Sequence, residues 1–161
     1  MKLLGQEIVQ LLAENEVKVG KLYEAIAENS RLEIGKEFFL GLAKDEYRHG
    51  NYFSRLLEEE NFTNYENPSE EKMDYVNYLM KTNVLRFEEE LIQKAKTIWK
   101  EEDCYIIADK IEREIILLVR ELIDLYPGMA PEVMEKVLLE EKSHLLKVNR
   151  AYDKYREKHI I

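Results

Sequence analysis

Apolar residues recur at intervals of three and four along most of this chain, which is the period of amphipathic helices. The spacing predicts a first helix over residues 2–28, a second over about 30–60, a third over about 103–126 and a fourth over about 131–158. Because only a few residues connect the first two helices, we expect them to be antiparallel neighbours. Almost no segment alternates apolar and polar residues at period two, so the sequence predicts an all-α protein.

Two local motifs predict where helices begin. Ser30 and Glu33 have the spacing of a capping box, in which each side chain bonds a backbone N–H of the first turn, so they predict the start of the second helix. Asn67 followed by Pro68 is typical of an N-cap followed by the first helical residue, and predicts that another helix opens there.

The middle of the chain predicts accessory helices and no part of the site. Residues 68–100 keep a helical period, with a break expected near Thr82–Asn83. A segment of this length fits a long helical crossover that carries the chain back along a four-helix bundle between its second and third helices. The length of 161 residues predicts one domain covering the whole chain, 1–161.

The net charge and the distribution of apolar residues indicate which partners and which cellular location to expect. The net charge is −9 and no basic cluster stands out, so we expect neither a nucleic acid nor a membrane surface as partner. No apolar run approaches the ~20 residues of a membrane span. Gln6, Glu7 and Gln10 interrupt the N-terminal apolar residues, so no signal peptide is predicted and a cytoplasmic location is expected. The single cysteine, Cys104, excludes an internal disulfide.

Two short motifs carry the candidate chemistry. Glu46 and His49, and again Glu141 and His144, have the form Glu-x-x-His. Residues three apart share a helix face, so each motif offers a carboxylate and an imidazole in one direction. Both motifs lie inside apolar stripes, where a charged carboxylate needs a partner such as a divalent metal. Two such pairs and one glutamate from each of two further helices can hold two iron or manganese ions.

An internal repeat supplies candidates for those two further glutamates. Glu16 precedes Glu46 by 30 residues, and Glu112 precedes Glu141 by 29. Each half of the chain therefore reads as helix, short turn and helix, with a lone glutamate on the first helix and Glu-x-x-His on the second. Glu114 is the alternative to Glu112, which we prefer because it matches the repeat.

The donor set also constrains the metal. Four carboxylates and two neutral imidazoles balance the charge of two divalent cations. Oxygen and nitrogen donors without a thiolate suit iron or manganese, and zinc is compatible as well. We interpret the neighbouring acids Asp45 and Glu140 as solvent-facing residues. For the tyrosines Tyr23, Tyr47 and Tyr105 we prefer a packing role, and the alternatives are hydrogen-bond donors to the metal ligands or redox-active tyrosines.

These residues resemble the ferritin-like di-iron carboxylate superfamily, and within it the rubrerythrin type, over about 2–60 and 103–158. Tyr23, seven residues after Glu16, fits the same family. The chain departs from full rubrerythrins because it has no four-cysteine rubredoxin domain, and because Ile115 stands where the family carries a further glutamate. The resemblance implies a ferritin-like four-helix bundle with these metal ligands: Glu16, Glu46, His49, Glu112, Glu141 and His144.

The resemblance also implies a function. Two iron or manganese ions per chain would react with peroxide or O2 in a peroxidase-type oxidoreductase, supplied by an external electron donor that the sequence does not identify, in a homodimer. The alternatives are a ferroxidase-type or metal-binding protein without substrate turnover, and a manganese catalase-like enzyme that disproportionates peroxide. A metal-free helical scaffold is a third class, and would need none of the six side chains.

Overall fold

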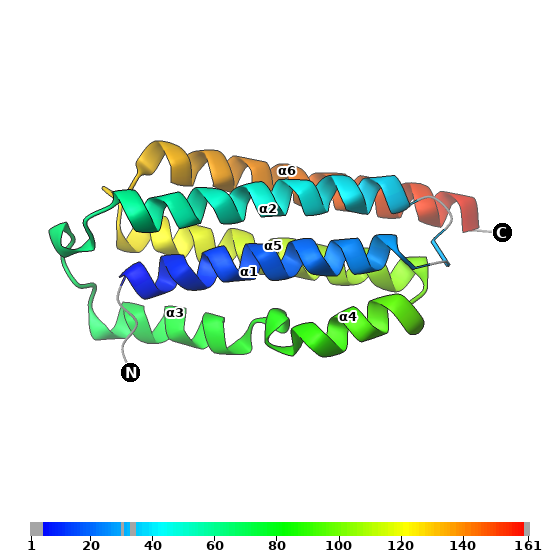
Figure 1. The fold of residues 1–161 in the computed structure, drawn as a ribbon, viewed down its shortest axis with the longest axis horizontal. Coiled ribbons are helices and arrows are strands. Elements are labelled where there is room, and N and C mark those ends of the chain that lie inside the picture. The colour runs from blue at the N-terminus through cyan, green and yellow to red at the C-terminus, as the bar shows by residue number, and fades with distance from the viewer. Residues whose placement is uncertain (1–4, 30, 33–34, 160–161) are drawn as a thin grey trace.

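The computed structural model describes residues 5–29, 31–32 and 35–159, and every regular element in them is helical, with no strand. The prediction of an all-α protein is confirmed. The predicted capping pair, Ser30 and Glu33, lies outside the described residues, but the second helix begins at Lys36 with Gly35 as its N-cap, so its predicted start near residue 30 was wrong. The elements, shown in Figure 1, are α1 (Gly5–Ala27), α2 (Lys36–Glu59), the 3₁₀ turn η1 (Phe62–Asn64), α3 (Glu70–Thr82), the 3₁₀ turn η2 (Val84–Phe87), α4 (Glu88–Thr97), α5 (Glu101–Leu125) and α6 (Pro131–His159).

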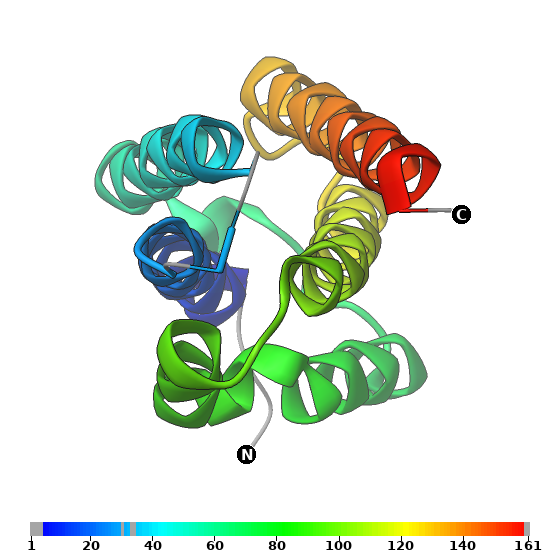
Figure 2. The ribbon, with the colours of Figure 1, turned by 90° about the vertical axis from the view of Figure 1, so that its right-hand side faces the viewer.

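The four long helices pack as two antiparallel hairpins. α1 pairs with α2 and α5 pairs with α6, and the two hairpins lie side by side as a bundle (Figure 1, Figure 2). The helices within a hairpin contact each other far more extensively than helices of different hairpins do. The interior between the hairpins is therefore where side chains from all four helices can meet.

The crossover between α2 and α5 runs along the length of the bundle. α3 contacts α5, α4 contacts α1, and together they carry the chain from one end of the molecule to the other (Figure 1). α3 ends at Thr82, which confirms the predicted break near Thr82–Asn83. η2 then leads into α4, so this segment forms two accessory helices.

The start of α3 differs from the prediction. The helix begins at Glu70 with Ser69 as its N-cap, and not at Pro68 with Asn67 as its N-cap. Ser69 has a ψ of 152°, which is extended backbone, so the chain cannot be helical before it. Pro68 therefore belongs to the connection that precedes the helix.

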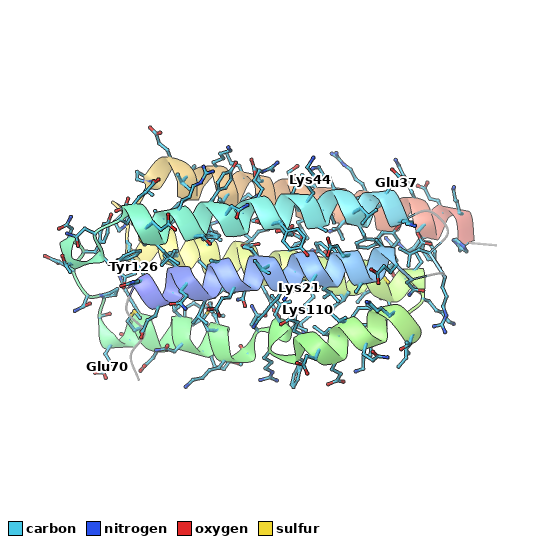
Figure 3. The ribbon with its side chains drawn as sticks, viewed as in Figure 1. Lys21, Glu37, Lys44, Glu70, Lys110 and Tyr126 are labelled. Carbon is cyan, nitrogen blue, oxygen red and sulfur yellow. The ribbon has the colours of Figure 1, made fainter. Side chains whose placement is uncertain are left out.

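Charged side chains cover the outside of the bundle. Glu37, Lys44 and Lys110 are exposed and project from the helices (Figure 3). The interior is filled by Leu, Ile, Val, Phe and Ala, with Tyr23 and Phe39 among its largest fully buried side chains. None of the described helices combines the length and the hydropathy that crossing a membrane needs. The buried polar side chains include four glutamates and two histidines that lie close together, and, elsewhere in the interior, Asn15, Asn29, Asn83 and Glu101.

Candidate metal centre

Helical spacing alone explains why these six polar side chains are buried. Each lies on the stripe that its helix turns inward, three or four residues from a buried apolar neighbour. On α2, Leu42 precedes Glu46 and Phe53 follows His49 at that spacing. The exposed fraction is 0% for each of the four glutamates and at most 1% for each of the two histidines. The six residues are Glu16 on α1, Glu46 and His49 on α2, Glu112 on α5, and Glu141 and His144 on α6.

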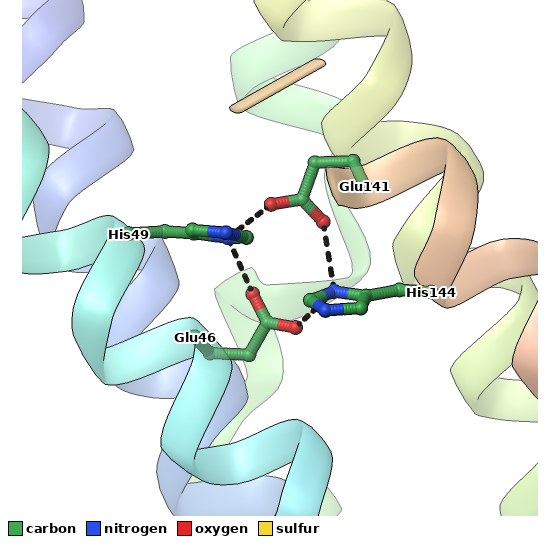
Figure 4. Close-up of side chains that lie close together, drawn as sticks. All are labelled: Glu46, His49, Glu141 and His144. Atoms are coloured by element: carbon green, nitrogen blue, oxygen red, sulfur yellow. Dashed lines mark ion pairs between the residues drawn. The ribbon is translucent and has the colours of Figure 1, made fainter. Parts of the chain in front are cut away.

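Glu46, His49, Glu141 and His144 form what we call the buried Glu/His cluster (Figure 4). Each offers a donor atom, and these atoms all lie within 4.8 Å of one another. Nδ1 of His144 lies 2.9 Å from Oε1 of Glu46 and 3.5 Å from Oε2 of Glu141. Nδ1 of His49 lies 3.4 Å from Oε2 of Glu46 and also contacts Glu141. Each histidine therefore faces the carboxylate of its own motif and that of the other.

Glu16 and Glu112 lie beside this cluster. Oε2 of Glu112 is 3.8 Å from Nδ1 of His144. The carboxyl group of Glu16 is close enough to those of Glu46 and Glu141 for their charges to act on it. The structure thus brings all six side chains predicted as ligands into one region of the interior.

The third-helix glutamate at the cluster is Glu112. Its Oε1 accepts a hydrogen bond of 2.5 Å from the hydroxyl of Tyr23, so Tyr23 has the donor role that was the alternative to the packing role we preferred. Glu114 points elsewhere: it is half-buried and accepts the backbone N–H of Val84 at 2.9 Å. Glu114 therefore holds the start of η2 in place, away from the cluster.

Two acids outside the cluster bond its histidines, and we refer to them as the outer acids. Nε2 of His49 lies 2.6 Å from Oε2 of Glu140, and Nε2 of His144 lies 3.2 Å from Oδ2 of Asp45. Arg48 joins both acids, at 3.0 Å from Asp45 and 3.1 Å from Glu140. The interpretation of these acids as solvent-facing was incomplete, because each side chain is only about a quarter exposed, at 24% and 27%. The available signal was that an acid directly precedes the glutamate in both motifs.

The carboxylates around each histidine favour its protonated form. Burial lowers the pKa of His49, but the contacts with Glu141 and Glu46 outweigh burial and raise it to about 10. The pKa of His144 rises to about 11 for the same reason. Burial alone raises the pKa of Glu46, yet its contacts with His144 and His49 bring it down to about 2. Without metal, the two imidazoliums therefore supply positive charge for the cluster.

Glu16 and Glu112 are held in the opposite state. Burial raises the pKa of Glu16 well above its ordinary value, and the charges of Glu141 and Glu46 raise it further. Burial likewise raises the pKa of Glu112, with the charge of Glu46 next in size. For both groups the protonated form is therefore favoured, and a nearby cation would favour loss of that proton.

The cluster fits a metal because its inward atoms lack hydrogen-bond partners. Neither oxygen of Glu16, Glu46 or Glu141 forms a well-aligned hydrogen bond among the described residues, and Glu46 and Glu141 meet the histidines only as ion pairs. The same is true of Nδ1 in both histidines. Buried polar atoms nearly always form hydrogen bonds, so a group of ligand atoms that face one another without well-aligned hydrogen bonds is a place where a cation can be bound. The outer acids complete this arrangement, since a ligating imidazole usually donates its other N–H to a carboxylate.

Comparison with known proteins found no family model, curated protein or solved structure that matches this chain. The function must therefore be argued from the site itself. What the chain shows is an all-helical protein with a buried Glu/His cluster able to hold metal.

Proposed function

We propose that this chain is a dinuclear iron or manganese carboxylate protein of the ferritin-like, rubrerythrin type, and that it is an oxidoreductase acting on peroxide or O2. One observation carries the proposal: two glutamates and two histidines from α2 and α6 place their donor atoms within 4.8 Å of one another in the interior. Glu16 and Glu112 bring the donor set to the six groups that bind two ions in bundles of this kind.

The residues of the chain would divide the work as follows. The two histidines and four glutamates would hold the ions, and the outer acids would fix the imidazole rings with Nδ1 turned inward. Bound iron or manganese would supply Lewis acidity and redox change. Tyr23 holds its hydroxyl proton next to Glu112, because burial raises the pKa of that phenol well above its ordinary value. The apolar side chains around the site exclude water.

One observation also favours metal binding without turnover. All six candidate ligands are closed off from solvent, with exposed fractions of 0–1%, so within the part of the chain that the structure describes no open channel reaches the ligands themselves. A metal-handling or metal-sensing protein needs no such channel. Repeated consumption of peroxide in the presence of a reductant would reject this second candidate.

Metal analysis with peroxide turnover tests the proposal. We expect about two iron or manganese ions per chain, and steady peroxide consumption when a reductant is supplied. Glu46→Ala should lose both properties. Glu37→Ala, on the exposed face of the same helix, should keep both and serves as the matched control. A metal content far below two per chain in protein reconstituted with either ion would contradict the proposal.

A further inference from the structure

A groove opens to solvent at one end of the bundle, between the beginnings of α2 and α5 and the second half of α6. This is the end that faces the viewer in Figure 2. Its volume is about 510 Å³, within the range of pockets that bind small organic ligands. Aromatic side chains from all three helices line it: Phe38, Tyr105 and Tyr155. Such a lining suits a ligand with a flat apolar body.

Four cations also line the groove, which we call the basic groove. They follow one face of α6 at intervals of three or four residues: Lys147, Arg150, Lys154 and Lys158. Among the described residues none of the four forms an ion pair, although Glu157 lines the same groove. The sequence prediction of no basic cluster was wrong here, because spacing along a helix gathers charges that are separated in the chain. In a chain of net charge −9, this surface would attract an anion.

Packed aromatic rings connect the basic groove with the metal centre. Ring centroids are 5.9 Å apart for Tyr155 and Tyr105, 5.6 Å for Tyr105 and Phe39, and 5.7 Å for Phe39 and Tyr23. Tyr23 ends the series with its hydrogen bond to Glu112. Each step lies within the distance at which aromatic side chains pack against one another. Electrons delivered in the groove would thus have a continuous series of contacts to the buried site.

We propose that the basic groove binds a planar aromatic anion of the flavin mononucleotide class, and that this ligand is the external electron donor of the metal centre. The cations would hold the phosphate, and the half-buried rings of Phe38 and Tyr155 would pack on the ring system, with the buried ring of Tyr105 behind them. The reduced flavin gives up two electrons and two protons. One peroxide takes up two electrons and two protons as its O–O bond breaks, and two waters form. The donor role rests on the proposed function, whereas binding in the groove does not.

Binding is tested with flavin mononucleotide itself, titrated into metal-free and metal-loaded protein and followed by flavin fluorescence. Lys147→Glu with Lys154→Glu should weaken binding by about tenfold or more. Lys72→Glu with Lys110→Glu makes the same charge change at exposed positions away from the groove and should leave binding unchanged. No binding at about 1 mM flavin mononucleotide, or equal loss in both double variants, would overturn the proposal.

The electron route is tested by Phe39→Leu, which removes one ring from the series. Flavin binding and metal content should stay the same while oxidation of reduced flavin by peroxide slows at least severalfold. An unchanged rate would overturn the route. Protein that binds two metals and consumes peroxide with other reductants, yet binds no flavin, would contradict only this inference. Protein that binds flavin but no metal would contradict the proposed function and the donor role together.

Discussion

His49 and His144 are held from both sides. Their Nδ1 atoms face the buried glutamates, and their Nε2 atoms face Glu140 and Asp45 at 2.6 and 3.2 Å. When a carboxylate accepts the Nε2 proton, the lone pair of a neutral imidazole is left on Nδ1, where a metal would be bound. The outer acids therefore decide which ring nitrogen is available.

Removing the outer acids should weaken metal binding without loss of the fold. Asp45→Asn with Glu140→Gln keeps the size of both side chains and removes their charge, and we expect metal affinity to fall by about 10–100-fold. Competition against a chelator of known affinity measures the change. Glu37→Gln on the exposed face of α2 is the control. Unchanged affinity in the double variant would show that these acids do not orient the rings.

Metal binding should release protons at neutral pH. His49 and His144 have pKa values of about 10 and 11, above neutral, so in metal-free protein both rings are protonated. A metal binds only the neutral ring, so each histidine must lose its proton, and Glu16 and Glu112 add to the release. Affinity should therefore rise as pH rises. Calorimetry in buffers of different ionisation enthalpy measures the release, and a heat independent of the buffer would contradict this prediction.

The sequence allowed prediction of which residues face the interior, but not of which neighbours meet there. Glu16 and Glu112 were found because a charge on an apolar stripe and a repeated spacing coincide. Asp45 precedes Glu46 by one residue, which is about 100° around the helix. The helical period therefore places Asp45 beside the inward-facing stripe of α2 and not on it. Which helix lies against that flank depends on packing between the two hairpins. The bond from Asp45 to His144 spans 99 positions, so the acid before the glutamate of each motif can be noticed in the sequence, but its partner cannot be identified there.

Among elements, α2 shows how a helix can contain two glycines with opposite packing. Gly50 faces α1, and a Cβ there would lie 3.4 Å from the backbone oxygen of Ala13. Gly41 is exposed, and a Cβ there would meet nothing within 4 Å. A Cβ at Gly50 would therefore make ordinary van der Waals contact with α1, and a Cβ at Gly41 would make none.

Gly41→Ala should stabilise the protein. Alanine is favoured over glycine inside a helix, so we expect a gain of about 0.5–1 kcal/mol in the free energy of unfolding. Urea denaturation measures it. Gly20→Ala on α1 is the comparison, because its Cβ would lie 2.7 Å from the ring of Tyr47 and would force that ring away from Glu24. A Gly41→Ala protein no more stable than Gly20→Ala would contradict this explanation.

Element boundaries were predictable where the pattern itself changes. The break at Thr82 and the last helix from Pro131 follow from the helical period and proline. The start of α3 at Glu70 was missed because both Asn67 and Ser69 can cap a helix. The choice between them depends on the path of the connection from η1, which local preference does not encode.

For the whole molecule, metal should raise stability because only the folded chain assembles the site. At a free metal concentration about 100 times the dissociation constant, the expected gain is about 2.7 kcal/mol, or roughly 5–10 °C in melting temperature for a chain of this size. Thermal unfolding with metal and with excess chelator measures the difference. Glu46→Ala should melt at the same temperature in both conditions. A wild-type melting temperature that chelator does not change would favour the metal-free scaffold.

The exchange of partners between the two motifs has a mechanical consequence. Asp45 of the first hairpin hydrogen-bonds His144 of the second, and Glu140 of the second hairpin hydrogen-bonds His49 of the first. Each hairpin thus depends on an acid of the other hairpin to orient its histidine. Metal bound at the centre would therefore hold the two hairpins together. Amide protons near the seam between α2 and α6 should then exchange with solvent more slowly once the ions are in place, while those on the outer flanks of the hairpins keep their rates.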